Sequence, residues 1–278
     1  MKRKNNTLTI GLVTYNGEKT LQNSLESLRK QTYKDFKLII SDNNSNDNTE
    51  KICKKYKKKF KNLNYIKRNK NFGPINNFWS VLERANTEFF MWASDDDIWD
   101  KDFIKILLKE LINDKNLDLV YCWTNVFDPS TGKTHKLFRP KNYYNKSKEF
   151  RYLQELIKPC VNKYYGIYRT QKLKQFNYKK YYLHDYQDTL LIDYFNLNFN
   201  IKIVEKKLFN YAEKIGRIRK SLDKNFQYKY FFKFNHFKYF YYSNILLFKS
   251  KFSFIIKLIY FLVFTIMFYG RKILSKFL

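Results

Sequence analysis

Three consecutive aspartates, Asp95, Asp96 and Asp97, closely follow the hydrophobic run Phe89–Trp92. Carboxylates this close raise one another's pKa, and a bound divalent cation is the usual way to offset their repulsion. Oxygen ligands beside a diphosphate suit Mg²⁺ or Mn²⁺. Aspartates here can also simply cap a helix that begins near Asp100, because carboxylates are favoured at helix N-termini. The cluster therefore indicates either a metal site or a helix cap.

Further polar residues directly follow two earlier hydrophobic runs in the sequence. Residues 15–17 (Tyr-Asn-Gly) come after the run Leu8–Thr14, and residues 41–45 (Ser-Asp-Asn-Asn-Ser) come after Phe36–Ile40. If these runs are parallel strands, their polar ends meet in the crevice where such sheets bind ligands. The chain has neither a P-loop nor a G-x-G-x-x-G turn, which argues against an ATPase or a dinucleotide-binding enzyme.

The elements that must position these groups follow from hydrophobic spacing, which predicts alternating strands and helices over the first 125 residues. This alternation is typical of an α/β fold with a mostly parallel, Rossmann-like sheet and helices on both faces. Residues 133–182 are expected to be irregular. The expected strands are Leu8–Thr14, Phe36–Ile40, Leu63–Ile66, Phe89–Trp92, Leu117–Cys122 and Ile201–Val204, and the expected helices pass through Leu21–Leu28, Ile52–Phe60, Phe78–Leu82, Asp102–Ile112 and Thr189–Leu197.

Four motifs lie within residues 7–125, namely 10–16 (Ile-Gly-Leu-Val-Thr-Tyr-Asn), 41–49 (Ser-Asp-Asn-Asn-Ser-Asn-Asp-Asn-Thr), 71–73 (Asn-Phe-Gly) and 93–99 (Ala-Ser-Asp-Asp-Asp-Ile-Trp). In order and spacing they resemble the motifs of the family 2 glycosyltransferases. The resemblance implies a glycosyltransferase-A fold and inverting transfer of a sugar from a nucleotide diphosphate donor, with a UDP-sugar expected. The family often has Asp where this chain has Ser94, and Asp95 can substitute for it.

The resemblance also implies roles for individual residues. Asp96 corresponds best to the family's metal ligand, Asp97 is implied as a further ligand, and Asp95 is implied to contact the nucleotide-sugar. The cation would be Mn²⁺ or Mg²⁺. Such a cation offsets the charge that builds on the leaving diphosphate. Asp42 is implied to accept a hydrogen bond from the base, usually uracil. The other residues implied to contact the nucleotide are Thr14, Tyr15, Asn16, Asn71, Phe72 and Gly73.

An inverting transfer needs a general base that takes the proton of the acceptor hydroxyl. In similar enzymes this base is an Asp that opens a helix late in the domain, and the segment 182–191 offers both Asp185 and Asp188. Counting back from the strand Ile201–Val204 favours Asp188, whereas the neighbourhood of Asp185, which follows His184, resembles the family's Glu-Asp pair. Either carboxylate can instead be a helix cap. The segment Tyr164–Arg169 resembles an acceptor-side segment whose rings either stack on sugars or pack inside the protein.

The C-terminal region has an unusual composition. The whole chain carries a net charge of +29, which reflects either an AT-rich genome or a polyanionic partner. From Lys214 to Leu278 there are 14 Lys and Arg and a single acid, Asp223. Residues 258–270 are too short an apolar run to span a bilayer. Aromatic and aliphatic residues interleaved with lysines suit helices that lie on an anionic membrane, although a helix docked on the catalytic domain is the alternative.

The predicted organisation is a catalytic domain over residues 1–212, with a nucleotide-sugar half (7–125) and an acceptor-side half (126–212), followed by a basic helical tail (213–278). The expected acceptor is a glycan or a lipid-linked sugar in cell-surface polysaccharide synthesis. The first apolar run is too short for a signal peptide, so a cytoplasmic protein on the inner face of the cell membrane is expected. The three cysteines have no zinc or disulfide spacing.

Two other classes of function compete with sugar transfer. A nucleotidyltransferase also uses metal-binding carboxylates on a similar sheet, but its Gly-rich N-terminal loop is missing here. Non-catalytic binding to a membrane or to RNA would account for the basic, aromatic tail. No RNA-binding motif is recognisable, so no nucleic-acid partner is expected.

Overall fold

The computed structural model describes residues 7–157, 161–183, 186–212 and 226–274. The chain forms two compact units that interleave along the sequence. The first unit contains the described residues within 1–142, 165–175 and 202–217, and the second those within 143–164, 176–201 and 218–278. Each unit is described below by itself.

The first unit is built on a sheet whose leading half is parallel. Its strands are β1 (Leu8–Thr14), β2 (Phe36–Asp42), β3 (Leu63–Lys67) and β4 (Phe89–Ser94), in the spatial order β3-β2-β1-β4. Adjacent strands of this set pair in parallel. Every residue of β1 is buried, as expected for a central strand that is covered on both faces. The predicted strands of this half are confirmed.

The other half of the sheet is antiparallel, so the sheet as a whole is mixed rather than mostly parallel. The short strand β8 (Ile167–Arg169) lies between β4 and β6 (Leu119–Phe127) and runs antiparallel to both, so β4 and β6 point the same way. The remaining strands pair antiparallel, β7 (Thr134–Phe138) with β6, and β5 (Ile98–Trp99) with β9 (Ile201–Ala212). Three residues leave too little periodicity to predict β8 from sequence.

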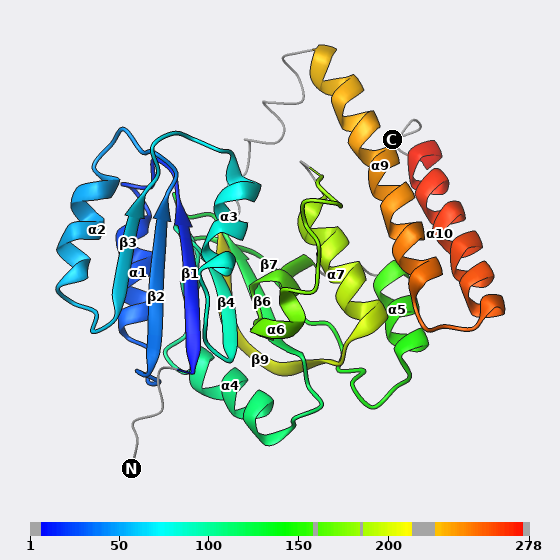
Figure 1. Cartoon of the computed structure of the whole chain (residues 1–278), viewed down its shortest axis with the longest axis horizontal. Coiled ribbons are helices and arrows are strands. Elements are labelled where there is room, and N and C mark those ends of the chain that lie inside the picture. The colour runs from blue at the N-terminus through cyan, green and yellow to red at the C-terminus, as the bar shows by residue number, and fades with distance from the viewer. Residues whose placement is uncertain (1–6, 158–160, 184–185, 213–225, 275–278) are drawn as a thin grey trace. The chain divides into compact units, whose positions relative to one another are not determined.

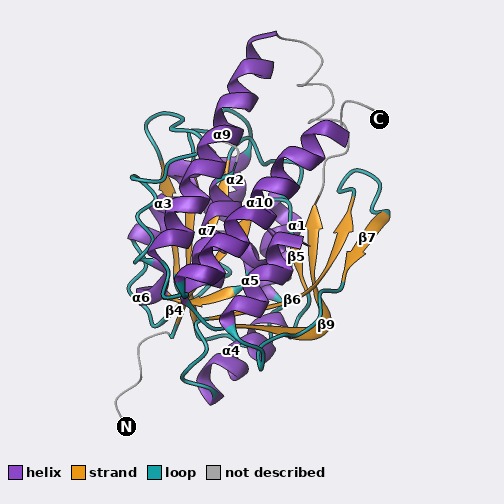
Figure 2. Ribbon diagram, turned by 90° about the vertical axis from the view of Figure 1, so that its right-hand side faces the viewer, coloured by secondary structure: helices purple, strands orange, loops and turns teal. Residues whose placement is uncertain are grey.

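Helices α1 (Leu21–Arg29) and α3 (Pro74–Glu83) cover opposite faces of the sheet (Figures 1 and 2). Helix α3 approaches β1 so closely that a Cβ on Gly11 would lie 2.5 Å from Val81 Cγ2. Beneath it, the ring of Trp92 packs edge-on against Trp79 at 5.4 Å between centroids. The unit also contains α2 (Thr49–Lys57), α4 (Phe103–Asn113) and α6 (Thr170–Leu173).

The second unit is helical and rich in aromatic packing. Its helices are α5 (Lys148–Ile157), α7 (Gln187–Asn198), α9 (Phe226–Lys249) and α10 (Phe254–Leu274). The 3₁₀ helix η1 (Val161–Tyr165) follows α5 in the sequence and belongs to this unit up to Tyr164. The expectation that residues 133–182 are irregular was wrong, because α5, β7 and β8 form there. Helix α7 was predicted. Among the described residues, no helix is both long and apolar enough to cross a membrane.

Polar side chains are buried between the helices of the second unit. Asp193 of α7 accepts hydrogen bonds from Tyr239 Oη (2.9 Å) and from Ser243 Oγ, two residues one turn apart on α9. Lys163 and Glu155 form a buried ion pair nearby. Burial raises the pKa of Asp193 to about 7. These contacts tie α9 to α7.

Candidate functional site

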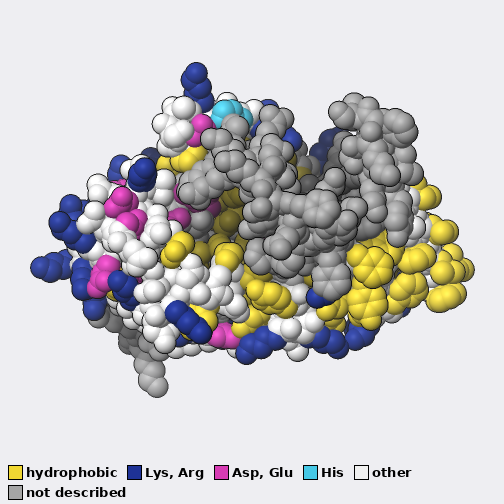
Figure 3. Space-filling model, turned by 90° about the horizontal axis from the view of Figure 1, so that it is seen from above, with side chains coloured by type: hydrophobic (Ala, Val, Ile, Leu, Met, Phe, Trp, Pro, Cys, Tyr) yellow, Lys and Arg dark blue, Asp and Glu magenta, His cyan; other side chains and the backbone are white. Residues whose placement is uncertain are grey.

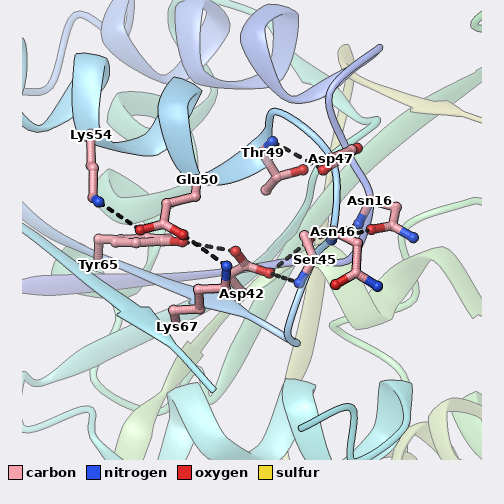
Figure 4. A network of polar contacts seen from close by, with 10 residues as sticks. All are labelled: Asn16, Asp42, Ser45, Asn46, Asp47, Thr49, Glu50, Lys54, Tyr65 and Lys67. Carbon is pink, nitrogen blue, oxygen red and sulfur yellow. Dashed lines mark hydrogen bonds and ion pairs between the residues drawn. The ribbon is translucent and has the colours of Figure 1, made fainter. Parts of the chain in front are cut away.

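The loops that follow β1 and β2 are joined by hydrogen bonds at the carboxyl edge of the parallel strands (Figure 4). Asn16 N donates to Ser45 Oγ (2.9 Å), and Asn46 N donates back to Asn16 Oδ1 (3.0 Å). Gly17 N donates to Thr49 Oγ1 at 2.9 Å. Asn16 has a positive φ of 52°, a conformation that Asn tolerates better than most residues. The two predicted motifs therefore form one structure, with the Tyr15 side chain 47% exposed beside it.

Asp42 lies at the end of β2 with no exposed surface. Its Oδ1 accepts from Ser45 N (2.8 Å) and Ser45 Oγ (2.6 Å), and its Oδ2 accepts from Tyr65 Oη (2.8 Å; Figure 4). Burial and the hydrogen bond to this carboxylate raise the pKa of Tyr65. The residue predicted to meet the base thus holds the loop after β2 in its present conformation. The predicted contact with a base stays untested.

Asn43, to which the sequence analysis gave no role, connects β2 to the segment 71–73. Its Nδ2 donates to Asn71 Oδ1 (2.6 Å) and to the Gly73 carbonyl (3.2 Å), and its Oδ1 accepts from Phe72 N (3.1 Å). Gly73 has φ 82°, which favours glycine. The Phe72 ring is 36% exposed, and the Arg68 guanidinium lies 4.2 Å from its centroid. Asn43 therefore sets the position of a segment predicted to line the nucleotide pocket.

Asp95 follows β4 directly and reaches the end of β1, where Thr14 Oγ1 donates to its Oδ2. A Cβ on Gly17 would lie 2.4 Å from Asp95 Oδ2 and 2.5 Å from Thr14 Oγ1, so only glycine fits beside this pair. The structure thus brings together motifs that are far apart in sequence, as the parallel arrangement predicted. Asp95 remains partly exposed.

The other two aspartates of the cluster differ sharply in their surroundings. Asp96 is partly exposed, and its Oδ1 accepts from Ser94 Oγ at 2.7 Å. Asp97 is fully buried, and its Oδ1 accepts from Ala212 N (2.9 Å) at the end of β9. Burial, with the charge of Asp96 as the next cause, raises the pKa of Asp97 well above its usual range. Its Oδ2 has no hydrogen-bond partner in the part of the chain that the structure describes.

The two partly exposed carboxylates are suited to a hard cation. Mg²⁺ in particular is commonly held by one or two carboxylates together with substrate phosphates rather than by a complete protein cage. Within the described ranges, no group of three or more His, Cys, Asp or Glu side chains is arranged to hold a metal unaided. Asp95 and Asp96 therefore fit a cation that a phosphate-bearing ligand helps to bind. The helix-cap alternative receives no support, since α4 begins at Phe103 and its N-cap residue is Asp102.

Of the two predicted bases, only Asp188 lies within the described residues, since Asp185 falls in the gap at 184–185. Asp188 is in the first turn of α7, in the second unit, and its Oδ1 accepts from Thr189 N at 2.7 Å. The N-cap position of α7 is occupied by Tyr186 rather than by an aspartate. Burial raises the pKa of the Asp188 carboxyl. Whether Asp185 or Asp188 is the base stays a prediction.

The segment Tyr164–Arg169, predicted to stack on sugars or to pack internally, mostly packs. Tyr168 in β8 is fully buried against Trp92, with 5.7 Å between ring centroids. Arg169 donates to the carbonyls of Leu117 (2.7 Å) and Leu111 (2.8 Å). Such contacts account for these side chains without a ligand.

The sequence model of the family described as Glycosyl transferase family 2 matches residues 9–175, more than half of the chain. The chain belongs to glycosyl transferase family 2. The protein is accordingly a glycosyltransferase, and the nucleotidyltransferase and non-catalytic alternatives lose their support.

Curated relatives of this glycosyltransferase include an uncharacterized glycosyltransferase of Methanocaldococcus jannaschii, 26% identical over 73% of this chain and 70% of that protein. Another is the GalNAc(5)-diNAcBac-PP-undecaprenol beta-1,3-glucosyltransferase of Campylobacter jejuni, 25% identical over 63% of this chain and 56% of that protein. The chain thus spans only part of the length of its relatives, little more than half in the second case.

Solved structures give the same fold for this glycosyltransferase. S. aureus TarS 1-349 in complex with UDP-GlcNAc has a TM-score of 0.71 at 19% identity, over 95% of this chain and 73% of that one. The same protein in complex with UDP has a TM-score of 0.69 at 18% identity, over 90% of this chain and 68% of that one. The predicted glycosyltransferase-A-like α/β fold and helical C-terminal region are thereby confirmed, whereas the sheet is mixed rather than mostly parallel.

Proposed function

We propose that this glycosyltransferase moves a sugar from a UDP-sugar to an acceptor hydroxyl with inversion and with help from Mn²⁺ or Mg²⁺. The observation that carries the proposal is the hydrogen-bonded edge of the first unit, where Thr14, Asp95 and Gly17 join the ends of β1 and β4. That edge is where parallel sheets bind ligands. The fold neighbour TarS has been solved with UDP and with UDP-GlcNAc, which supports the same donor class here.

Asp96 is the proposed metal ligand, with Asp95 as the second carboxylate. Both are partly exposed, whereas Asp97, which was predicted as a ligand, is buried and holds Ala212. Asp97 is therefore proposed to position the cluster by fastening it to β9. When bound, the cation would supply Lewis-acid stabilisation of the leaving diphosphate. Ser94, which donates to Asp96, would keep that carboxylate oriented toward the ligand.

The proposed base is Asp188, with Asp185 as the alternative. The base would take the proton of the acceptor hydroxyl while the hydroxyl oxygen forms a bond to the anomeric carbon. The bond from that carbon to the diphosphate oxygen breaks, and UDP leaves with the electron pair. Burial raises the pKa of Asp188, which brings a carboxylate closer to the neutral range where a general base is most effective.

The nucleotide contacts are proposed from the loops at this edge. Tyr15 and Phe72 have the largest exposed apolar surfaces there, and the segment 71–73 is held by Asn43. Exposed rings can pack against a base or a ribose. Asp42 would act on the nucleobase through the loop after β2, which it holds by its hydrogen bonds to Ser45 and Tyr65.

A glycan or a lipid-linked sugar is the proposed acceptor, with the enzyme peripheral on the inner face of the cell membrane. The Campylobacter jejuni relative carries PP-undecaprenol, a lipid diphosphate, in its name. The 14 Lys and Arg from Lys214 onward would be attracted to anionic lipid, by on the order of 1 kcal/mol for each one near the surface.

Donor hydrolysis in the absence of acceptor tests the central part of the proposal. The full chain is incubated with a panel of nucleotide-sugars, with Mn²⁺, with Mg²⁺ or with EDTA, and released nucleotide is measured. We expect release from UDP-sugars with either cation and none with EDTA. Equal release with EDTA would refute the metal dependence, and release only from a different nucleotide would refute the UDP assignment.

A further inference from the structure

Helix α10 has one face that packs within the second unit. Tyr260 is 6% exposed, and its Oη donates to the Glu149 carbonyl at 2.6 Å. The same ring lies 5.6 Å from that of Tyr152 of α5. One turn later, Phe264 is 8% exposed and stacks on Phe240 of α9 at 5.4 Å between centroids. Tyr260 and Phe264 therefore pack this face of α10 against α5 and α9.

The opposite face of α10 is apolar and exposed. Successive residues of an α-helix are 100° apart, so the six exposed apolar residues of α10 cover an arc of about 140° around the helix, centred away from Tyr260. Figure 3 shows hydrophobic side chains gathered on the side that α10 occupies in Figure 1. We call these six residues the outer face of α10: Phe254 (67% exposed), Ile255 (70%), Leu258 (41%), Ile259 (49%), Leu262 (57%) and Ile266 (69%).

A contiguous apolar stripe of this kind marks an interaction surface, unlike scattered single residues. Its surroundings are basic. Lys249 at the end of α9 and Lys251 in the turn that leads into α10 are exposed, and no acidic residue follows Asp223 in the sequence. An occupant must therefore be apolar at its centre and negatively charged at its rim. A second copy of this chain would bring the same lysines and a further net charge of +29.

We propose that the outer face of α10 inserts into the surface of an anionic lipid bilayer, with the helix lying in the plane of the membrane. A helix with one apolar face and basic flanks binds in this way. No helix among the described residues is long and apolar enough to cross, which fits an in-plane position. The proposal builds on the proposed function, since a lipid-linked acceptor gives the contact its purpose, but the contact itself does not depend on sugar transfer.

The described part of the tail exposes apolar residues on both helices: Phe237, Tyr241 and Phe248 on α9, and the broader outer face on α10. Helix α9 is held on α7 by the hydrogen bonds from Tyr239 and Ser243 to the buried Asp193. It also supplies Phe240 to the packed face of α10. The described part of α9 therefore anchors α10 to its unit, and the broader exposed apolar surface available for the lipid contact is the outer face of α10.

Cosedimentation of the full chain with vesicles tests the proposal. Vesicles of phosphatidylcholine alone are compared with vesicles that also contain phosphatidylglycerol. Substitutions Ile259→Glu and Leu262→Glu, made together, place charges at the centre of the outer face. Ile112→Glu is the matched control, because Ile112 is 55% exposed on α4 of the first unit. Leu258→Gln with Leu262→Gln is a milder second variant in case the charged pair fails to fold, which circular dichroism will show.

We expect the wild type and Ile112→Glu to bind the anionic vesicles. The charged double variant should bind them at least about tenfold more weakly, from the loss of inserted apolar surface. Unchanged binding by both double variants overturns the proposal, as does equal binding of the wild type to uncharged vesicles. The proposal is also overturned if the wild type forms a dimer, does not bind vesicles, and loses the dimer in either double variant. The outer face would then bind a second copy of the chain. Donor hydrolysis is measured in parallel, and its absence alongside vesicle binding counts against the proposed function only.

Discussion

The two acids that the first unit exposes at its proposed site differ from the acids that the second unit buries between its helices. In the first unit, Asp95 and Asp96 stand partly exposed at the edge of the sheet. In the second unit, Asp193 and Glu155 are buried between helices, where Tyr239, Ser243 and Lys163 satisfy them. A strand end presents its polar residues to a ligand crevice, whereas a helix face that packs on its neighbours pairs most of the polar groups that it buries. The comparison predicts catalytic effects from acids in the first unit and structural effects from Asp193 in the second.

The largest effect is expected at Asp96. Asp96→Asn should lower metal-dependent hydrolysis of the donor by about 10³-fold, because it removes a charged ligand for the cation. Asp35→Asn is the matched control, since Asp35 is exposed and outside the site. Both are measured as a function of Mn²⁺ concentration. Activity retained with the same Mn²⁺ dependence would remove Asp96 from the site.

A smaller loss is expected at the base, for which the second unit offers Asp188 and, as the alternative, Asp185. Asp188→Asn should leave UDP affinity unchanged and lower transfer about 10²-fold, the usual contribution of a general base. Asp185→Asn is assayed beside it. If only that variant loses transfer, Asp185 is the base. If neither variant loses transfer, both carboxylates are structural, like Asp193 and Glu155 of the same unit.

Asp193 should affect the pH dependence of folding stability and should not affect catalysis. Burial, with a smaller contribution from the charge of Glu155, raises its pKa to about 7 in the folded protein, although the hydrogen bonds from Ser243 and Tyr239 and the charge of Lys163 act in the other direction. The unfolded chain releases the proton near pH 4, so the stability from this group falls as pH rises from about 4 to 7 and is constant above.

Thermal unfolding of wild type and Asp193→Asn across this pH range checks that sign. The wild-type midpoint should decrease with pH by a few degrees more than that of Asp193→Asn, which cannot titrate there. Asp35→Asn should follow the wild type. A parallel pH slope in wild type and Asp193→Asn would show that Asp193 is already ionised throughout.

The smallest effect is expected at Asn43. Asn43→Ala removes three hydrogen bonds to the segment 71–73, and UDP affinity should fall by roughly five- to tenfold, about 1 kcal/mol. Asn23→Ala on the exposed side of α1 is the control. Isothermal titration with UDP and Mn²⁺ measures both. An unchanged affinity would place the segment 71–73 outside the nucleotide pocket.

Much of the first unit was predictable because its signals are local. The strands β1 to β4 and the helices between them follow from runs of hydrophobic residues, and parallel pairing then places their carboxyl ends together. The family motifs stand at those ends. The short strand β8 was missed because three residues show no period. The helix α5 was missed although its buried residues Tyr152, Glu155 and Leu156 recur at helical spacing.

The sequence by itself determined which residues end the parallel strands, since the alternation of hydrophobic runs sets both the strands and the polar groups behind them. Only the tertiary structure decided how neighbouring aspartates divide their roles. Asp97 is buried because Ala212, 115 residues later, brings its backbone N–H to it, while Asp96 beside it stays partly exposed. Tertiary packing likewise decided which face of α10 is buried and which is exposed, because Tyr260 and Phe264 pack on other helices. Contacts between distant residues depend on how the whole chain packs, and local composition does not carry that information.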